Sequence, residues 1–253
     1  TSVGTATAVT ATGLTLTNGT TYYIGARAKN GAGLFSTAAF SDGITVGVDT
    51  TPPTGTVTIN SGAVYTNSTA VTVSLSATDN SGTVSQMQFS NDNVTYSTPE
   101  AYATTKAWTM ASGDGTKTVS AKFQDQAGNW SAAVSDTIVL DTTLPSAPVV
   151  TDDGAYTTST TQLHVIWTAS SDAGSGVADY QYQITQDSVG GALVRDWTSV
   201  GLVTATTATG LSLVNGRAYY IGVRAINGAG LASNAGWSNG ITVDTSPPTG
   251  TAI

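Results

Sequence analysis

A long internal repeat constrains this sequence more than any other feature. Residues 1–46 match residues 198–243 without a gap, and about two residues in three are identical. The offset between the copies is too long for the unit of a solenoid. After two extra residues the match continues from DTTPPTGT at Asp49 into DTSPPTGT at Asp244. The repeating unit is therefore predicted to be a pair of domains.

Proline-containing junctions mark the domain boundaries. Similar sequences begin at Asp49, Asp141 and Asp244, and each follows an apolar strand-like segment. Proline cannot donate to a β-ladder, so a strand does not run through these points. We predict two complete domains, residues 49–143 and 144–246. Each is close to the roughly 100 residues of a small β-sandwich.

The two ends of the sequence are expected to be parts of further domains. Residues 1–48 align with the second half of the later domain and lack the strands that correspond to residues 148–196. Such a half-domain would expose an apolar face and an open sheet edge. Residues 247–253 are expected to start another domain. We therefore expect the same alternation to continue in a longer polypeptide, and strand exchange between copies is the alternative.

Alternating apolar and polar residues predict strands throughout, and no helical stripe of useful length is present. Turn sequences such as SGDG, NGAG and DNSG separate these segments. The pattern predicts an all-β chain and disfavours α/β folds and their cofactor sites. The expected strands are Ala70–Thr78, Val84–Ser90, Lys117–Asp125, Thr161–Ala169, Tyr180–Thr185 and Ala218–Ile226.

Composition narrows the possible partners. The net charge is −8 and no Lys/Arg cluster is present, which disfavours nucleic acid and anionic membranes. Charged residues make up only 9% of the chain, and cysteine is absent. Each domain must therefore be held by its own apolar core rather than by disulfides. No apolar run approaches the roughly 18 residues of a membrane span, so this segment is not expected to insert into a membrane.

Two segments resemble the E–F region of fibronectin type III domains. GLSLVNGRAYYIGVRAINGAGLAS from Gly210 and its copy from Gly13 contain a leucine, a turn glycine, a tyrosine and a second glycine-bearing turn. The resemblance implies that Tyr219 and Tyr22 bond an upstream backbone group, with Leu213 and Leu16 beneath them. It also implies that Trp167 is the core tryptophan.

The middle domain resembles the immunoglobulin-like repeats of large bacterial and archaeal surface proteins. The resemblance lies in residues 76–97 and 117–145. Together the two likenesses imply tandem immunoglobulin-like and fibronectin type III-like β-sandwiches joined by short Pro-containing linkers. They imply an extracellular or cell-surface location in a prokaryote, with neighbouring repeats or copies of the same protein as partners.

The junction aspartates are candidate calcium ligands. Calcium takes several oxygen ligands, and Asp49, Asp141 and Asp244 lie where loops of two domains can converge. The next candidates are Asp172 in SSDAGSG and Asp125 in QDQAGN. The alternative is an Asx turn, in which each junction carboxylate accepts from the backbone amides that follow it. No loop has the acid density of a dedicated calcium loop.

The sequence does not indicate an enzyme. The single histidine, His164, alternates with apolar residues on a predicted strand and is interpreted as a half-exposed packing residue. NGAG at Asn227–Gly230 is interpreted as a hairpin turn and not as a phosphate loop. Trp108, Trp130, Trp197 and Trp237 could stack on surface glycans, but packing between domains is favoured.

The function predicted from these features is structural or adhesive. We expect a repeat segment of a large extracellular surface or filament-forming protein. The alternative is an accessory spacer or carbohydrate-binding region of a secreted hydrolase.

Overall fold

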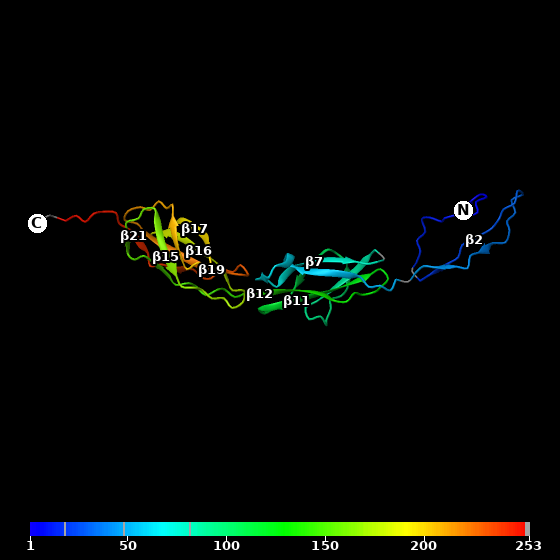
Figure 1. Ribbon diagram of the computed structural model, residues 1–253, viewed down its shortest axis with the longest axis horizontal. Helices are drawn as coiled ribbons and strands as arrows, with labels where there is room; N and C mark the ends of the chain where they lie inside the picture. Colours follow the sequence, from blue (N-terminus) through cyan, green and yellow to red (C-terminus); the bar gives the residue numbers. More distant parts are fainter. Residues whose placement is uncertain (18, 48, 81, 251–253) are drawn as a thin grey trace.

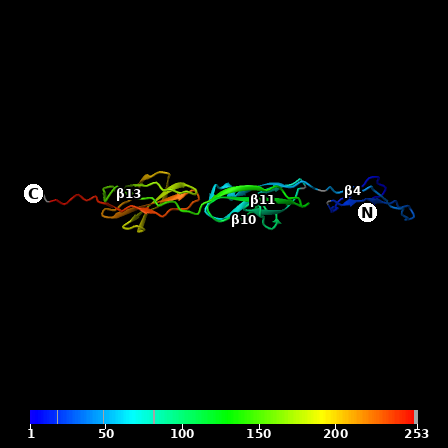
Figure 2. The ribbon, with the colours of Figure 1, turned by 90° about the horizontal axis from the view of Figure 1, so that it is seen from below.

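The computed structural model describes residues 1–17, 19–47, 49–80 and 82–250. The chain forms an elongated molecule in which three units lie end to end (Figures 1 and 2). The N-terminal unit is at one end and the extended C-terminal residues are at the other. Strands and turns form almost all of the ordered structure, as the alternating pattern predicts.

The middle unit is a sandwich of two sheets. One sheet has the order β10-β7-β5 and the other β6-β12-β11-β8-β9. A short 3₁₀ turn, Asn60–Gly62, follows β5. All pairs are antiparallel except β6 with β12, which is parallel. The strands are β5 (Thr54–Ile59), β6 (Tyr65–Thr66), β7 (Ala70–Thr78), β8 (Val84–Ser90), β9 (Glu100–Ala101), β10 (Thr105–Thr109), β11 (Gly115–Asp125) and β12 (Val134–Leu140).

Alternate residues of these strands form the core of the middle sandwich. In β7, Val71, Val73 and Leu75 point inward, while the residues between them are exposed or half-buried. Successive side chains of a strand point to opposite faces, so one strand supplies every second residue to the core. Phe89 and Phe123, on the opposite sheet, are fully buried against this layer.

The last unit repeats this architecture. Its sheets have the orders β13-β15-β18 and β14-β21-β19-β16-β17, and β20 adds to β19. The short β14 again pairs in parallel with the last strand, β21. The strands are β13 (Val150–Asp152), β14 (Tyr156–Thr157), β15 (Gln162–Trp167), β16 (Val177–Gln186), β17 (Ala192–Gly201), β18 (Ala205–Thr209), β19 (Ala218–Asn227), β20 (Gly236–Trp237) and β21 (Ile241–Val243).

The predicted core residues of the last sandwich are confirmed. Trp167 is 5% exposed and Tyr219 is completely buried. The Tyr219 hydroxyl accepts a hydrogen bond from the Val214 amide at 2.7 Å. Leu213 is buried as expected. This contact fixes the turn before β19 to the strand that follows it.

The described residues of the first unit form only short strand pairs. β1 (Thr21–Tyr22) pairs with β4 (Ile44–Thr45), and β2 (Gly25–Ala26) pairs with β3 (Ala39–Phe40). The Tyr22 hydroxyl accepts from the Thr17 amide at 2.8 Å, so the copied turn keeps its tyrosine contact.

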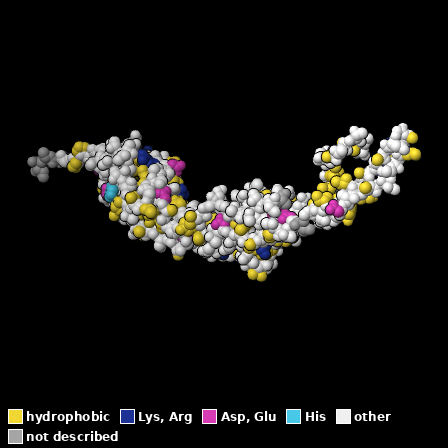
Figure 3. Space-filling view, turned by 45° about the vertical axis from the view of Figure 1, so that its right-hand side comes forward, with side chains coloured by type: hydrophobic (Ala, Val, Ile, Leu, Met, Phe, Trp, Pro, Cys, Tyr) yellow, Lys and Arg dark blue, Asp and Glu magenta, His cyan; other side chains and the backbone are white. Residues whose placement is uncertain are grey.

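Residues that are core in the last sandwich are exposed in this first unit. Ile24 and Ile44 are each 66% exposed, whereas their copies Ile221 and Ile241 are 1% and 2% exposed. Leu16, expected beneath Tyr22, is 47% exposed. The apolar side chains are visible along this unit in Figure 3. The predicted apolar face of residues 1–46 is therefore present in the structure.

The junction between the last two units contains no strand. Residues 141–149 lie outside every strand, and in the part of the chain that the structure describes no sheet includes strands from both sides of them. The expected start of a further domain, residues 247–253, is extended as far as Gly250, and its remaining residues lie outside the described part of the chain. Among the described residues, none belongs to a helix with the length and apolar character needed to cross a membrane.

Candidate functional site at the domain junctions

All three junction aspartates form the Asx turn that was the alternative to calcium binding. The Oδ1 atom of Asp49 accepts from the Thr51 amide at 3.0 Å. Asp141 accepts in the same way from Thr143 at 3.1 Å. Asp244 accepts from Ser246 at 3.0 Å. One Asx-turn bond leaves a carboxylate with further acceptor positions, so the turn does not decide whether a cation binds.

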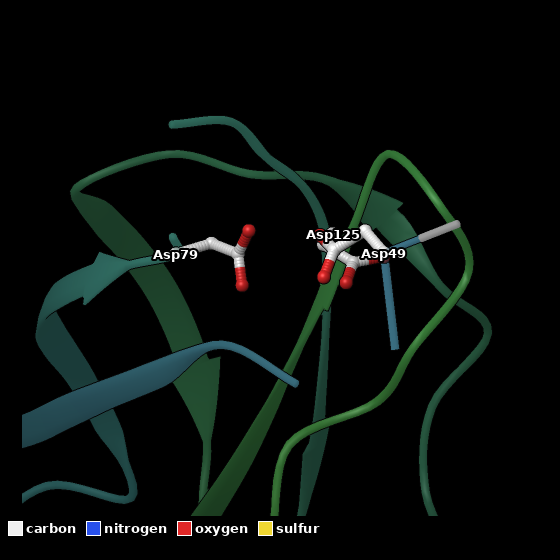
Figure 4. A group of neighbouring side chains, drawn as sticks. All are labelled: Asp49, Asp79 and Asp125. Carbon is white, nitrogen blue, oxygen red and sulfur yellow. The ribbon is translucent and has the colours of Figure 1, made fainter. Parts of the chain in front are cut away.

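Three carboxylates converge at the first junction. Asp49 comes from the linker, Asp79 from the loop after β7, and Asp125 from the end of β11. One oxygen of each lies within 4.8 Å of the others. Asp49 and Asp125 lie side by side, and Asp79 faces them from the opposite side (Figure 4). Two like charges at about 4 Å repel by about 4 kcal/mol near a protein surface, so this arrangement favours a bound cation.

The local fold holds Asp125 in place. It is 1% exposed, and its two oxygens accept from the backbone amide and the side-chain amide of Asn129, both at 2.8 Å. The same side-chain amide donates to the Asp49 carbonyl at 2.9 Å, which ties the linker to the turn. Burial raises the pKa of Asp125, but the hydrogen bonds from Asn129 and the turn amides outweigh it and lower the pKa.

The second junction surrounds Asp141 with donors. Asp141 is completely buried. Its Oδ1 accepts from the Thr143 amide and hydroxyl, and its Oδ2 accepts from the Ser175 amide and hydroxyl at 2.9 and 2.6 Å. A fifth donor, the side-chain amide of Asn227, lies 2.9 Å from Oδ2. A carboxylate has about four lone-pair positions, so these donors use its full capacity.

The environment of Asp141 lowers its pKa. Burial raises the pKa, but the hydrogen bonds from Ser175 and Thr143 favour the ionised form by more. Calcium at Asp141 would have to displace donors that already satisfy the carboxylate. In the structure, Asp141 accepts hydrogen bonds from residues of the next sandwich, Ser175 and Asn227. Calcium binding at Asp141 stays a prediction.

The two junctions use equivalent positions. Asp141 corresponds to Asp49, and Asp172 in the loop before β16 corresponds to Asp79 in the loop before β8. A third pair of equivalent residues begins the turns after β11 and β19, namely Asp125 and Asn227. In both turns this residue donates to, and accepts from, the residue four positions later: Asp125 with Asn129, and Asn227 with Leu231.

Further contacts cross the second junction. The Asn67 side-chain amide donates to the Ala229 carbonyl at 3.1 Å. Gly228 packs against Tyr65, and a β-carbon at Gly228 would lie only 3.0 Å from that ring. The NGAG segment is therefore a hairpin turn, as expected, and it contacts the neighbouring domain.

The sequence-predicted ligands have different surroundings. Asp49 and Asp125 are brought together. Asp141 and Asp172 instead accept hydrogen bonds from the same two donor residues, Ser175 and Asn227. Asp244 is exposed, and no neighbouring acid joins it among the described residues. Asp79 was missed by the sequence reasoning. Its loop, ATDNSG, has the same place after a strand as the ASSDAGSG loop of Asp172, and that comparison would have identified it.

The other singled-out side chains lie within single domains. Trp108 contacts Phe89, with ring centroids 5.3 Å apart, and Trp197 contacts Trp237 at 6.4 Å. Arg224 lies over the Trp197 ring at 4.3 Å. The ring contacts of Trp108, Trp197 and Trp237 therefore lie within one sandwich and not between domains, which is where packing of these three was expected. His164 is on the outward face of β15, and its Nδ1 is 2.7 Å from Asp153 Oδ1.

The fold defines the class of protein: a tandem of β-sandwiches of the immunoglobulin-like and fibronectin type III-like kind. A scan against models of protein families found no match, and a search of curated proteins found none either.

Several solved structures are similar to this chain. Domains A168–A170 of titin are 18% identical, with a TM-score of 0.51, over 86% of this chain and 73% of theirs. Fibronectin(III)-like modules of Clostridium thermocellum CbhA are 17% identical, with a TM-score of 0.45, over 78% of this chain and 99% of theirs. The FN1–FN3 domains of chicken CNTN1 are 16% identical, with a TM-score of 0.43, over 86% and 76%. At 18% identity the titin domains show the fold alone.

Proposed function

We propose that this chain is a stiff structural spacer segment of a prokaryotic extracellular surface or filament protein, with neighbouring repeats or further copies as its partners. The observation that carries the proposal is the burial of Asp141 by the loops of the next sandwich. Such a contact restricts the angle between neighbours and keeps successive units in line. Length and stiffness are then the properties that the segment provides.

The surface composition supports this role. Only 9% of residues are charged, cysteine is absent, and each sandwich has its own buried core. Folding therefore needs no oxidising step, and a domain can be added or removed without exposing the core of its neighbour.

We further propose that calcium binds the first junction at Asp49, Asp79 and Asp125 and stiffens it. Three carboxylates supply oxygen ligands, which calcium prefers, and water completes the six to eight positions that it takes. The linker aspartate and two loop aspartates of the middle sandwich would then share one ion.

A melting experiment tests the calcium site. A ligand that binds only the folded form stabilises it, and at about 100 times Kd the gain is about 2.7 kcal/mol. Extracellular calcium modules have Kd values of about 10⁻⁴ to 10⁻³ M, so about 10 mM calcium is a suitable concentration. We expect the melting temperature of the middle sandwich to rise with calcium relative to EDTA.

Asp79→Asn is expected to abolish that rise, because it removes one of the three charges. Asp244→Asn is the matched control, because Asp244 is an exposed junction aspartate outside the cluster. Equal melting temperatures of the unmodified chain in calcium and in EDTA would overturn the calcium proposal and leave the spacer role standing.

A further inference from the structure

The two junctions differ in charge at one equivalent position. At the first junction the turn begins with Asp125, and at the second it begins with Asn227. Asn227 is 2% exposed. Its amide nitrogen donates to Asp141 Oδ2 at 2.9 Å and to the Thr143 carbonyl at 3.0 Å, and it lies 3.4 Å from Asp172 Oδ2. One neutral donor group thus lies between two carboxylates and a carbonyl.

The Asn227 amide offers hydrogen bonds to the carboxylates of Asp141 and Asp172, so their negative charges are stabilised without a metal ion. Hydrogen bonds to a charged group are stronger than bonds between neutral groups, and burial strengthens them further. The bonds join the turn of the last sandwich to residues 141 and 143, which end the middle sandwich. Asn227 therefore fixes the turn against the linker, and its own Oδ1 is used to hold the turn through Leu231.

We propose that the hydrogen bonds from the Asn227 side chain to Asp141 and Thr143 hold the last two sandwiches in one orientation without a bound cation. We call this set of contacts the lock. Where the equivalent residue is aspartate, as at position 125, the junction instead depends on a divalent cation. This second part rests on the proposed calcium site. The difference between a carboxylate at residue 125 and an amide at residue 227 would then make the first junction cation-dependent and the second cation-independent.

The test compares Asn227→Asp with Asn227→Ala in the full chain. The aspartate keeps the Oδ1 that accepts from Leu231, as Asp125 does from Asn129, so the turn is retained. It removes the donor and places a third negative charge beside Asp141 and Asp172. The alanine removes the donor without adding a charge. Asn30→Asp is the matched control, because Asn30 begins the same NGAG turn and is exposed.

The readout is the orientation of the last two sandwiches. Because the chain has no cysteine, Val94→Cys and Leu202→Cys can carry two spin labels, and both positions are exposed, at 81% and 67%. Pulsed electron paramagnetic resonance then gives the distance distribution. We expect the unmodified chain and Asn30→Asp to give equally narrow distributions in EDTA and in calcium.

Asn227→Ala is expected to widen the distribution about twofold in both conditions, because an unbalanced buried carboxylate pair loosens the contact. Asn227→Asp is expected to widen it in EDTA and to recover the narrow distribution in calcium. Terbium luminescence should then count one site in the unmodified chain, none in Asp125→Asn and two in Asn227→Asp.

The possible failures are distinguishable. A narrow distribution for folded Asn227→Ala and Asn227→Asp in EDTA would overturn the lock. A widened distribution with no recovery in calcium would keep the lock and overturn the link between residue 227 and cation dependence. Absence of terbium binding to the unmodified chain would overturn the proposed calcium site, while the Asn227→Ala result would still decide the lock.

Discussion

Asp141 shows at the scale of one residue how a buried charge can be stabilised by hydrogen bonds. Its carboxylate has five donors from Thr143, Ser175 and Asn227, and it is completely buried. Removing a charge from water is costly unless such bonds replace its hydration. Thr143 lies in the linker, whereas Ser175 and Asn227 belong to the last sandwich. The hydrogen bonds that offset the burial of Asp141 therefore also connect the two domains.

The lowered pKa of Asp141 predicts an acid-sensitive junction. The folded state binds the Asp141 proton more weakly than the unfolded state, whose pKa is about 3.9. The stabilisation is therefore fully present above about pH 4 and is lost as pH falls through the lower pKa of the folded state. We expect the free energy of unfolding of the last sandwich, measured in urea, to decrease over that interval.

Asp141→Asn is the control for this pH dependence. The variant is expected to be less stable than the unmodified chain at pH 7, because a neutral amide cannot accept all five hydrogen bonds. Its stability should change less below pH 4, because the titrating group is gone. The same acid dependence in both chains would show that other carboxylates cause it.

At the scale of elements, the turn after β19 connects the last sandwich to the middle one. Gly228 donates to the Gly176 carbonyl at 2.9 Å, which ties this turn to the loop before β16. A β-carbon at Gly228 would lie 2.7 Å from the Ser175 carbonyl oxygen and 3.0 Å from the Tyr65 ring. Glycine is required here because two backbones and a neighbouring side chain come close together.

Gly228→Val is therefore predicted to open the junction. Overpacking costs about 1 to 3 kcal/mol, and here the turn can relieve it by moving away from Tyr65. The spin-label distance distribution across the junction should widen. Gly31→Val tests the same substitution in the copied turn, where no atom lies within 4 Å of the added carbon, and it should have little effect on that distribution. Equal effects of the two variants would contradict the prediction.

At the scale of the whole molecule, the three units differ in how much core they contain. The middle and last units each enclose a cluster of buried apolar side chains. In residues 1–47 the corresponding side chains, such as Ile24 and Ile44, are 66% exposed. Local opening requires little free energy where few apolar contacts are buried, so this unit should open most readily.

Limited chymotrypsin digestion is expected to cleave the first unit before either sandwich. Phe35 and Phe40 are exposed at 51% and 69%, whereas Phe89 and Phe123 are completely buried. Mass spectrometry should find a resistant fragment that begins after Phe40 and keeps both sandwiches. Cleavage between the two sandwiches at the same rate would contradict this order, because Asp141 and its partners protect that junction.

Local sequence patterns were enough to predict the main strands and several core residues. The resemblance to fibronectin type III domains implied that Trp167 and Tyr219 are core residues, and both are buried. The alternating patterns predicted Ala70–Thr78 and Val84–Ser90 with the bounds that the structure has. These features depend on local periodicity, because each strand residue faces either the core or the solvent. The repeat likewise related the turns at Asn30 and Asn227, and the Asx turns followed from residues two positions apart.

The side chains that meet at the junctions could be identified only from the three-dimensional arrangement of the loops. Asp79 joins Asp49 and Asp125 from a loop that the sequence reasoning had not singled out, and Asn227 reaches Asp141 from 86 positions along the chain. No local pattern contains these contacts, because they arise where loops from different strands of one sandwich dock on the linker from another. The docking brings equivalent positions together at both junctions, and the residue type at one of them, Asp125 or Asn227, then separates the carboxylate cluster of the first junction from the amide-linked pair of the second.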